Sequence, residues 1–259
     1  MKTFKGDFYK FYEMLRNKIP FSFCKFSDGE LFILQNKELI LGPRPEHHSY
    51  TDDQDHKTFI PGIHEFYRQK LFNSLSYCAN NYYAGICVPS DQGNEIFNWM
   101  KEISKKDDDH LSWANLFVNS NYGLYRDLFI KEYSNYEIVI VCNQKSDIKK
   151  LPFKIKKDFR VGTNCIINDY PLVEQMKTWV KDNNIKNHLF LFCCSSLGNF
   201  LCHQLHEIEP NNTYFDCGST LNPLLGLSLD RGYLSAYEGV LWRGQDTKND
   251  LERDEPWGS

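Results

Sequence analysis

Two almost purely apolar runs constrain the fold of this chain more than any other feature. Residues 137–142 read EIVIVC and residues 188–194 read HLFLFCC. Short runs that are apolar at consecutive positions, rather than at alternate ones, are typical of strands buried on both faces. Such strands occur in parallel sheets that are covered by helices. Further strands are expected over residues 21–26, 82–88, 114–118, 159–162 and 213–217.

Segments with helical periodicity alternate with these strands. The spacing of Phe4, Phe8, Phe11 and Leu15 predicts a first helix, which Pro20 ends. Other helical segments are expected over residues 31–34, 63–78, 96–103, 124–133, 172–180 and 198–206. Residues 42–61 are expected to form a long polar loop, and residues 145–157 a lysine-rich connector. The alternation predicts an α/β fold: a Rossmann-like, mostly parallel sheet with helices on both faces, as one domain over residues 1–259.

Composition excludes several classes of protein. Hydrophobic residues make up 41% of the chain and charged residues 25%, which argues against intrinsic disorder. The net charge of −4 argues against a protein that coats nucleic acid or an anionic membrane. No apolar run approaches the ~18 residues of a transmembrane segment, and the N-terminus lacks the pattern of a signal peptide. The nine cysteines include no CxxC pair, which favours buried, reduced thiols and a cytoplasmic location.

A pair of carboxylates follows the first expected strand. Asp28 and Glu30 flank Gly29 at the carboxyl end of that strand, where ligands bind in open α/β sheets. Two such carboxylates can converge on one divalent cation whose other ligands are phosphate oxygens, and Gly29 lets a diphosphate approach the backbone. The same residues, with Ser27, also form the S-x-x-E pattern of a helix capping box. The two interpretations are compatible, because the start of a helix can also carry a site.

The segment FCKFSDGELFIL resembles the hallmark segment of the GT-D-type glycosyltransferases, in which a strand of the form R-[FY]-G-D-G-E leads into a helix. Asp28, Gly29 and Glu30 match this pattern, Lys25 stands at the position of the arginine, and Ser27 replaces a glycine. The resemblance continues through YYAGICVPS, LFVNSNY, EIVIVCN, LFLFCCSSLGNFLCHQL and NNTYFDCGSTLNPLLG. It therefore covers most of residues 21–226.

The resemblance implies a glycosyltransferase that moves a sugar from a nucleoside-diphosphate sugar, with a UDP-sugar favoured, to a glycan or another hydroxyl acceptor. Asp28 and Glu30 would be catalytic and would hold the divalent metal, Mn²⁺ or Mg²⁺. The residues expected to bind the nucleotide sugar are Lys25, Ser27, Gly29, Asn119, Asn121, Ser195, Ser196, Gly198 and Asp216. A nucleic-acid partner is not expected.

Other groups of residues leave alternatives open. The turn over residues 194–198 either presents backbone N–H groups to an anion or is a plain tight turn. It also resembles a degenerate nucleophile elbow around Ser196, although no histidine follows His206 as the hydrolase order requires. The loop over residues 44–56, rich in His and Asp, is either solvated or the source of a general base. Arg231 and Tyr233 either reach a phosphate or lie in a surface salt bridge. The alternative functions are a non-catalytic nucleotide-binding or interaction protein and, less favoured, a serine hydrolase.

Overall fold

The computed structural model describes residues 3–42 and 56–239. Its centre is a seven-stranded sheet in which every neighbouring pair is parallel, with the order β5-β4-β1-β9-β8-β6-β7. The strands are β1 (Ser22–Lys25), β4 (Tyr82–Ile86), β5 (Leu111–Trp113), β6 (Ile138–Asn143), β7 (Ile155–Val161), β8 (Leu189–Cys193) and β9 (Thr213–Asp216). The predicted Rossmann-like α/β fold is confirmed.

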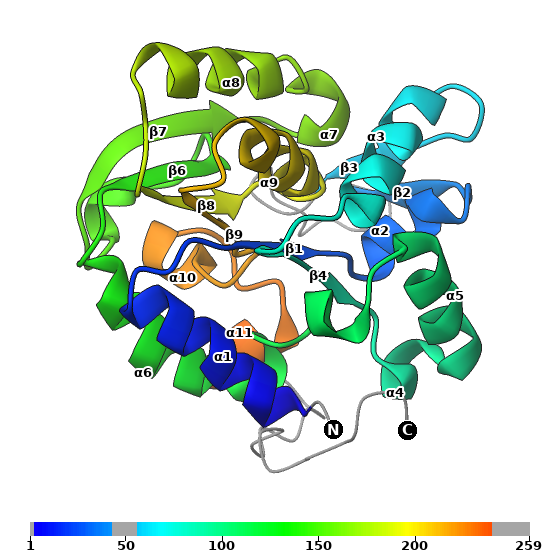
Figure 1. The fold of residues 1–259 in the computed structure, drawn as a ribbon, viewed down its shortest axis with the longest axis horizontal. Coiled ribbons are helices and arrows are strands. Elements are labelled where there is room, and N and C mark those ends of the chain that lie inside the picture. The colour runs from blue at the N-terminus through cyan, green and yellow to red at the C-terminus, as the bar shows by residue number, and fades with distance from the viewer. Residues whose placement is uncertain (1–2, 43–55, 240–259) are drawn as a thin grey trace.

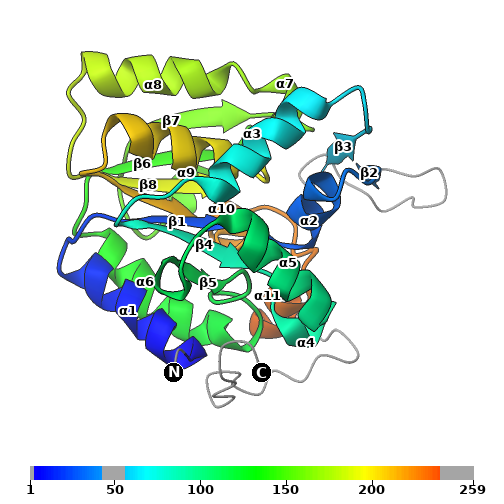
Figure 2. The same ribbon diagram turned by 45° about the vertical axis from the view of Figure 1, so that its right-hand side comes forward.

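Helices cover both faces of this sheet (Figures 1 and 2). One face carries α3 (Glu65–Ser76), α8 (Leu172–Asp182) and α9 (Leu197–Ile208). The other face carries α1 (Phe4–Arg16) and α6 (Tyr122–Tyr133). The remaining α-helices are α2 (Asp28–Leu34), α4 (Pro89–Gln92), α5 (Asn94–Ser104), α7 (Cys165–Asn168), α10 (Asn222–Leu225) and α11 (Gly232–Tyr237). Within the described ranges, none of the helices combines the length and hydrophobicity needed to cross a bilayer.

An aromatic cluster fixes α1 and α6 against the sheet. Phe117 lies at its centre, with ring centroids 4.9 Å from Phe129, 5.0 Å from Phe215 and 5.1 Å from Phe23. Phe11 of α1 packs on Phe23 at 5.0 Å. All five rings are at most 4% exposed. Tilted and edge-to-face contacts of this kind add to the large hydrophobic stabilisation that burial of aromatic rings provides. The cluster therefore makes the sheet a rigid support for the loops at its ends.

Three sequence predictions need correction. Residues 42–61 are not a loop throughout, because β2 (Leu39–Leu41) pairs antiparallel with β3 (Lys57–Phe59); residues 43–55 lie outside the described residues. The connector is expected up to residue 157, but β7 begins at Ile155. It is an edge strand whose exposed lysines interrupt the apolar pattern by which a buried strand is recognised. The strand expected over residues 114–118 lies at Leu111–Trp113. There, a polar Ser112 is buried because its hydroxyl donates a 2.6 Å hydrogen bond to Asp7.

The cysteine prediction is confirmed for the bonding state. All nine cysteines are free thiols, and most of them are buried.

Candidate active site

A cavity of about 830 Å³ lies at the carboxyl ends of the strands. The residues that end or follow each of the seven strands contribute to its lining, which is where open α/β sheets bind their ligands. Among the predicted site residues, those that line it are Lys25, Ser27, Asp28, Gly29, Glu30, Asn119, Ser195 and Asp216. The fold therefore brings most of the predicted set together around one space.

The turn from β1 into α2 carries the two predicted carboxylates. The capping box is confirmed: Glu30 accepts the backbone N–H of Ser27 at 3.1 Å, and α2 begins at Asp28. The Asp28 side chain is exposed in the cavity lining, and its Oδ1 accepts the N–H of Gly29 at 2.9 Å. The two carboxylates thus differ in environment. Asp28 is open to a ligand, whereas Glu30 is only 6% exposed.

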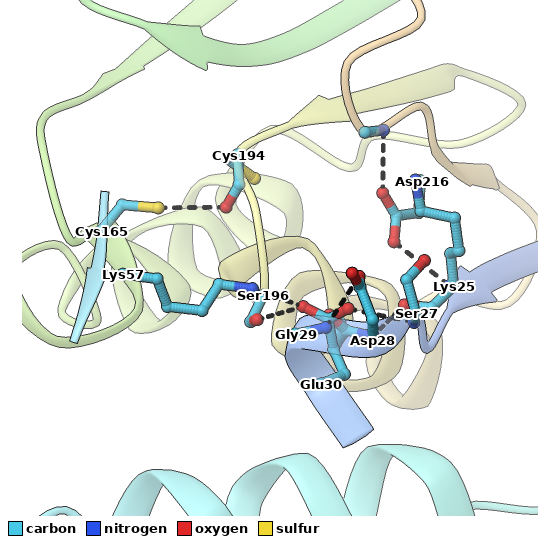
Figure 3. A network of polar contacts seen from close by, with 12 residues as sticks. Lys25, Ser27, Asp28, Gly29, Glu30, Lys57, Cys165, Cys194, Ser196 and Asp216 are labelled. Atoms are coloured by element: carbon cyan, nitrogen blue, oxygen red, sulfur yellow. Dashed lines mark hydrogen bonds and ion pairs between the residues drawn. The ribbon is translucent and has the colours of Figure 1, made fainter. Parts of the chain in front are cut away.

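Glu30 is the acceptor for three separate segments of the chain (Figure 3). Its Oε1 accepts the Lys57 ammonium at 2.7 Å and the Ser196 hydroxyl, while its Oε2 accepts the Ser27 N–H. Burial alone would raise the pKa of Glu30. The positive charge of Lys57, with the hydrogen bonds from Lys57 and Ser196, outweighs burial and lowers this pKa below its usual value. Glu30 is therefore a buried, ionised carboxylate with its charge compensated by Lys57.

A second buried carboxylate lies at the end of β9. Asp216 is 5% exposed, and its oxygens accept the N–H groups of Lys25 at 3.1 Å and Gly218 at 3.0 Å. Burial raises the pKa of Asp216 to about 6, even though Lys25 opposes the shift. Gly218 has a φ of +52°, and a Cβ at this position would overlap the Lys25 ammonium. This turn therefore favours glycine, because a side chain there would be strained and would displace the Lys25 ammonium.

The turn from β8 into α9 contributes to the cavity lining and donates a hydrogen bond to Glu30. Ser195 has a φ of +50° and lines the cavity, whereas Ser196 is fully buried and bonds Glu30. Gly198 lies beneath the lining, because a Cβ there would lie 3.4 Å from Cβ of Phe192 and 3.6 Å from Oδ1 of Asp216. Ser196 and Gly198 are thus close to the site without lining it.

Asn119 and Asn121 separate in the structure. Asn119 adopts a φ of +55° and lines the cavity. Asn121 is 1% exposed and donates to the carbonyl of Leu116 at 2.9 Å, so it shapes the turn instead of lining the space. Arg231 and Tyr233 also line the cavity, and the Tyr233 hydroxyl lies 2.8 Å from that of Ser219.

The main residue missed by sequence reasoning is Lys57. It lies on β3, inside the stretch expected to be a loop, and no local pattern marks it. Its partner Glu30 is 27 positions away along the chain, so only the tertiary fold shows the pair. His56 and Asp91 also line the cavity. Of the loop residues considered as a source of a base, those over residues 44–55 lie outside the described residues.

The charged residues of the described lining bear on the predicted metal. They are Lys25, Lys57 and Arg231 against Asp28, Glu30, Asp91, Asp216 and Asp230. Five carboxylates against three cations leave an excess of two negative charges, which would repel an anionic ligand that arrived alone. A divalent cation would balance this excess, and Asp28 offers an exposed carboxylate, the hard oxygen ligand that such ions prefer. The described residues therefore fit a divalent cation in charge.

The geometry limits which residues could hold that cation. Among the described residues, no group of three or more His, Cys, Asp or Glu side chains is placed to hold a metal ion. Glu30 already accepts three donors, one of them an ammonium. A cation would thus rely on Asp28 and on ligand oxygens, an arrangement common for Mg²⁺. The metal site at Asp28 and Glu30 remains a prediction.

The nucleophile-elbow alternative gains no support from these contacts. The Ser196 hydroxyl donates to Glu30 and is shielded from solvent. His203 and His206 lie on α9, where their ring nitrogens contact Ser74, Tyr77 and Asn81. A serine hydrolase needs its nucleophile and base within hydrogen-bond reach of each other, at an accessible position.

No protein-family profile and no curated protein sequence matches this chain. Two solved structures are similar to it. One is described as "The highly conserved domain of unknown function 1792 has a distinct glycosyltransferase fold", with a TM-score of 0.55 and 13% identity over 94% of this chain and 86% of that one. The other is a selenomethionine-substituted structure of domain of unknown function 1792, with a TM-score of 0.54, 13% identity and the same coverage. The glycosyltransferase resemblance found in the sequence therefore extends to the architecture, and the chain has a glycosyltransferase-like fold.

Proposed function

We propose that the protein is a glycosyltransferase that moves a sugar from a nucleoside-diphosphate sugar to a hydroxyl acceptor. One observation carries the proposal: in a chain with a glycosyltransferase-like fold, the Asp28–Glu30 turn and two lysines line one cavity at the carboxyl ends of all seven strands. We further propose the GT-D type, a UDP-sugar as the favoured donor and a glycan as the acceptor, on the basis of the motif over residues 25–30.

The donor diphosphate has a natural position in this arrangement. Lys25 and Lys57 bring two positive charges to the lining, and the β8–α9 turn brings the N-terminus of a 12-residue helix beside them. Preorganised charges of this kind stabilise the negative charge that develops on a leaving diphosphate, which is often the largest contribution to catalysis. The rest of the lining, which includes Asn119 and Tyr233, would then be available to the sugar and the acceptor.

The divalent cation belongs to the same proposal. Mn²⁺ or Mg²⁺ would be held by Asp28 together with the donor phosphates, and it would neutralise the excess negative charge of the lining. Asp216, whose pKa is about 6, adds negative charge near Lys25 at neutral pH, and its carboxylate also accepts the backbone N–H of Lys25.

The experiment is a binding and turnover screen on one preparation. UDP, GDP, ADP and CDP, and the corresponding nucleotide sugars, are each added with Mn²⁺ or with EDTA, and thermal shifts are recorded. For each nucleotide sugar that binds, release of the nucleoside diphosphate is measured with and without glycan acceptors. We expect at least one to raise the melting temperature, more strongly with Mn²⁺, and to release its diphosphate.

The outcomes separate the alternatives. Binding without release in the presence of any acceptor would favour a non-catalytic nucleotide-binding protein. Equal binding in Mn²⁺ and EDTA would contradict the metal role. No shift with any nucleotide would contradict the proposed function as a whole.

A further inference from the structure

We propose, building on the proposed function, that Lys57 binds the diphosphate of the donor and that Glu30 is the positioning residue that holds Lys57. In this arrangement Glu30 acts through the lysine and is not a metal ligand, whereas Asp28 remains the residue open to a cation.

The position of Lys57 is unusual for a lysine. The residue is 3% exposed, yet it is part of the cavity lining, on β3, which pairs antiparallel with β2. Lysine is almost never this buried unless its charge is paired. The ammonium lies so close to the β1–α2 turn that a Cβ at Gly29 would be 3.0 Å from Nζ. Lys57 therefore places a positive charge beside the turn where the donor diphosphate is proposed to bind.

Glu30 is arranged to hold that charge. Its carboxylate joins the β1–α2 turn, β3 and α9 through Ser27, Lys57 and Ser196 (Figure 3). A divalent ion bound to Glu30 would have to displace an ammonium 2.7 Å from Oε1 or lie against it. Either change is costly in a buried site, because breaking such a pair leaves an uncompensated charge.

The chemistry of an ammonium suits this dual contact. It has three donors, so a bond to Glu30 is compatible with a bond to a phosphate oxygen. Lysine is a common phosphate ligand as a point charge, as in P-loops. The pair would also explain the D-G-E spacing without a second metal ligand: the glutamate at the third helical position reaches both the cap and the lysine.

The experiment measures nucleotide binding and folding together. Four variants are compared with the wild type: Lys57→Met, Glu30→Gln, the double variant Lys57→Met with Glu30→Gln, and Lys181→Met. The last removes an exposed lysine of α8, outside the described cavity lining, as a charge-matched control. UDP, GDP, ADP and CDP are titrated calorimetrically in Mn²⁺, each beside its nucleoside, and melting curves are recorded without ligand.

We expect Lys57→Met to lower the melting temperature and to weaken diphosphate binding at least tenfold. The double variant should recover most of the melting temperature, because it removes both buried charges, but should stay at least tenfold weaker in binding. Lys181→Met should match the wild type, and affinity for any nucleoside that binds should change less than twofold. Recovery of both melting temperature and affinity in the double variant would show a purely structural ion pair and overturn the inference.

The role assigned to Glu30 is tested separately by titrating Mn²⁺ in the presence of a fixed concentration of the diphosphate that binds, and following free Mn²⁺ by electron paramagnetic resonance against the same titration without protein. Glu30→Gln should bind Mn²⁺ within about threefold of the wild type, whereas Asp28→Asn should bind it far more weakly. An equal loss in both variants would make Glu30 a ligand and overturn its positioning role. A wild type that binds none of the four diphosphates would contradict the proposed function itself, a result distinct from wild-type binding that Lys57→Met leaves unchanged.

Discussion

Polar groups at the two ends of the central sheet differ in their charge and in their partners. At the amino ends, the partly buried Asn81 donates to the carbonyls of Pro20 and Pro210, each at 3.1 Å, and its Oδ1 lies 2.8 Å from Nε2 of the buried His206. Near them, the Tyr214 hydroxyl donates to the carbonyl of Glu209 at 2.9 Å. These groups bond one another and the backbone. At the carboxyl ends, Glu30 and Asp216 are equally buried, but they are charged and line a cavity. Glu30 is paired with the Lys57 ammonium, whereas Asp216 accepts the backbone N–H groups of Lys25 and Gly218.

The difference separates groups that stabilise the fold from groups that prepare a site. Hydrogen bonds between neutral buried groups add modestly to stability, and their loss is costly. Buried ion pairs contribute little net stability, because desolvation offsets the attraction between the charges. Two buried carboxylates in the lining of one cavity are therefore better explained by a ligand than by stability, in keeping with the tendency of perturbed ionisable groups to cluster at functional sites.

The largest effects that test this difference are expected when one polar residue is changed at each end of the sheet. Asp28→Asn should lower sugar transfer by at least ~100-fold at saturating Mn²⁺, because a neutral amide is a weaker ligand for a hard cation. Its melting temperature should stay near that of the wild type, since Asp28 is exposed. Asn81→Ala should do the reverse, costing about 1–3 kcal/mol of unfolding free energy with normal transfer at 25 °C. Near-normal transfer by Asp28→Asn would contradict the assignment.

Acidification should lower the free energy of unfolding through His206, which lies at the amino ends of the strands. Burial, with His203 and Lys106, lowers the pKa of His206 to about 4, against about 6.5 in the unfolded chain. Stability from the neutral ring is therefore present above pH 6.5 and is lost as the pH falls toward 4, by about 3 kcal/mol. His206→Gln removes this titration. The check is urea unfolding at pH 7 and pH 4.5; equal losses of stability in the variant and the wild type would contradict it.

Asp216, at the carboxyl end, should respond to pH in the opposite direction to His206. Burial raises the pKa of Asp216 to about 6 in the folded chain, above the unfolded value of 3.8. The stability that the protonated Asp216 contributes is complete below pH 3.8 and is lost as the pH rises through 6. This loss is about 3 kcal/mol, slightly less than the loss caused by His206. Between pH 4 and 6 the effects of His206 and Asp216 offset each other in the wild type. Asp216→Asn should therefore lose more stability on acidification than the wild type does in the same urea series.

The smallest expected effect concerns the turn before α9. Ser195→Ala and Ser196→Ala should each change nucleotide affinity less than about fivefold. Ser196→Ala should cost about 1 kcal/mol of stability, because Glu30 loses one donor but keeps Lys57 and Ser27. Calorimetric titration and melting curves measure both quantities. A loss of binding as large as that of Lys57→Met would mean that the hydroxyl itself, and not the fold of the turn, contacts the ligand.

The sequence predicted those parts of the molecule that depend on local pattern. The apolar runs at β6 and β8 and the S-x-x-E cap of α2 were read correctly, because periodicity and capping are properties of neighbouring residues. The edge of the sheet that carries the cavity followed from the rule for strand ends.

What escaped prediction depends on contacts between distant segments. β3 has three residues and follows a polar stretch, so nothing local marks Lys57 as the partner of Glu30. Asn121, Ser196 and Gly198 lie in or next to turns with suitable residue types, but packing against neighbouring segments decides that they do not line the cavity. Residue type indicated the correct turns, and only the tertiary fold separated lining residues from supporting ones.

The central claim, that the carboxyl-end cavity binds a nucleoside-diphosphate sugar, is tested most directly by hydrogen–deuterium exchange of the wild type with and without a saturating nucleotide sugar and Mn²⁺. We predict slower exchange in peptides covering residues 25–30, 56–59 and 193–199, which surround the cavity. Peptides covering residues 78–81 and 209–212, at the amino ends of the strands, should be unchanged. Protection confined to the amino ends, or no protection with any nucleotide sugar, would contradict the claim.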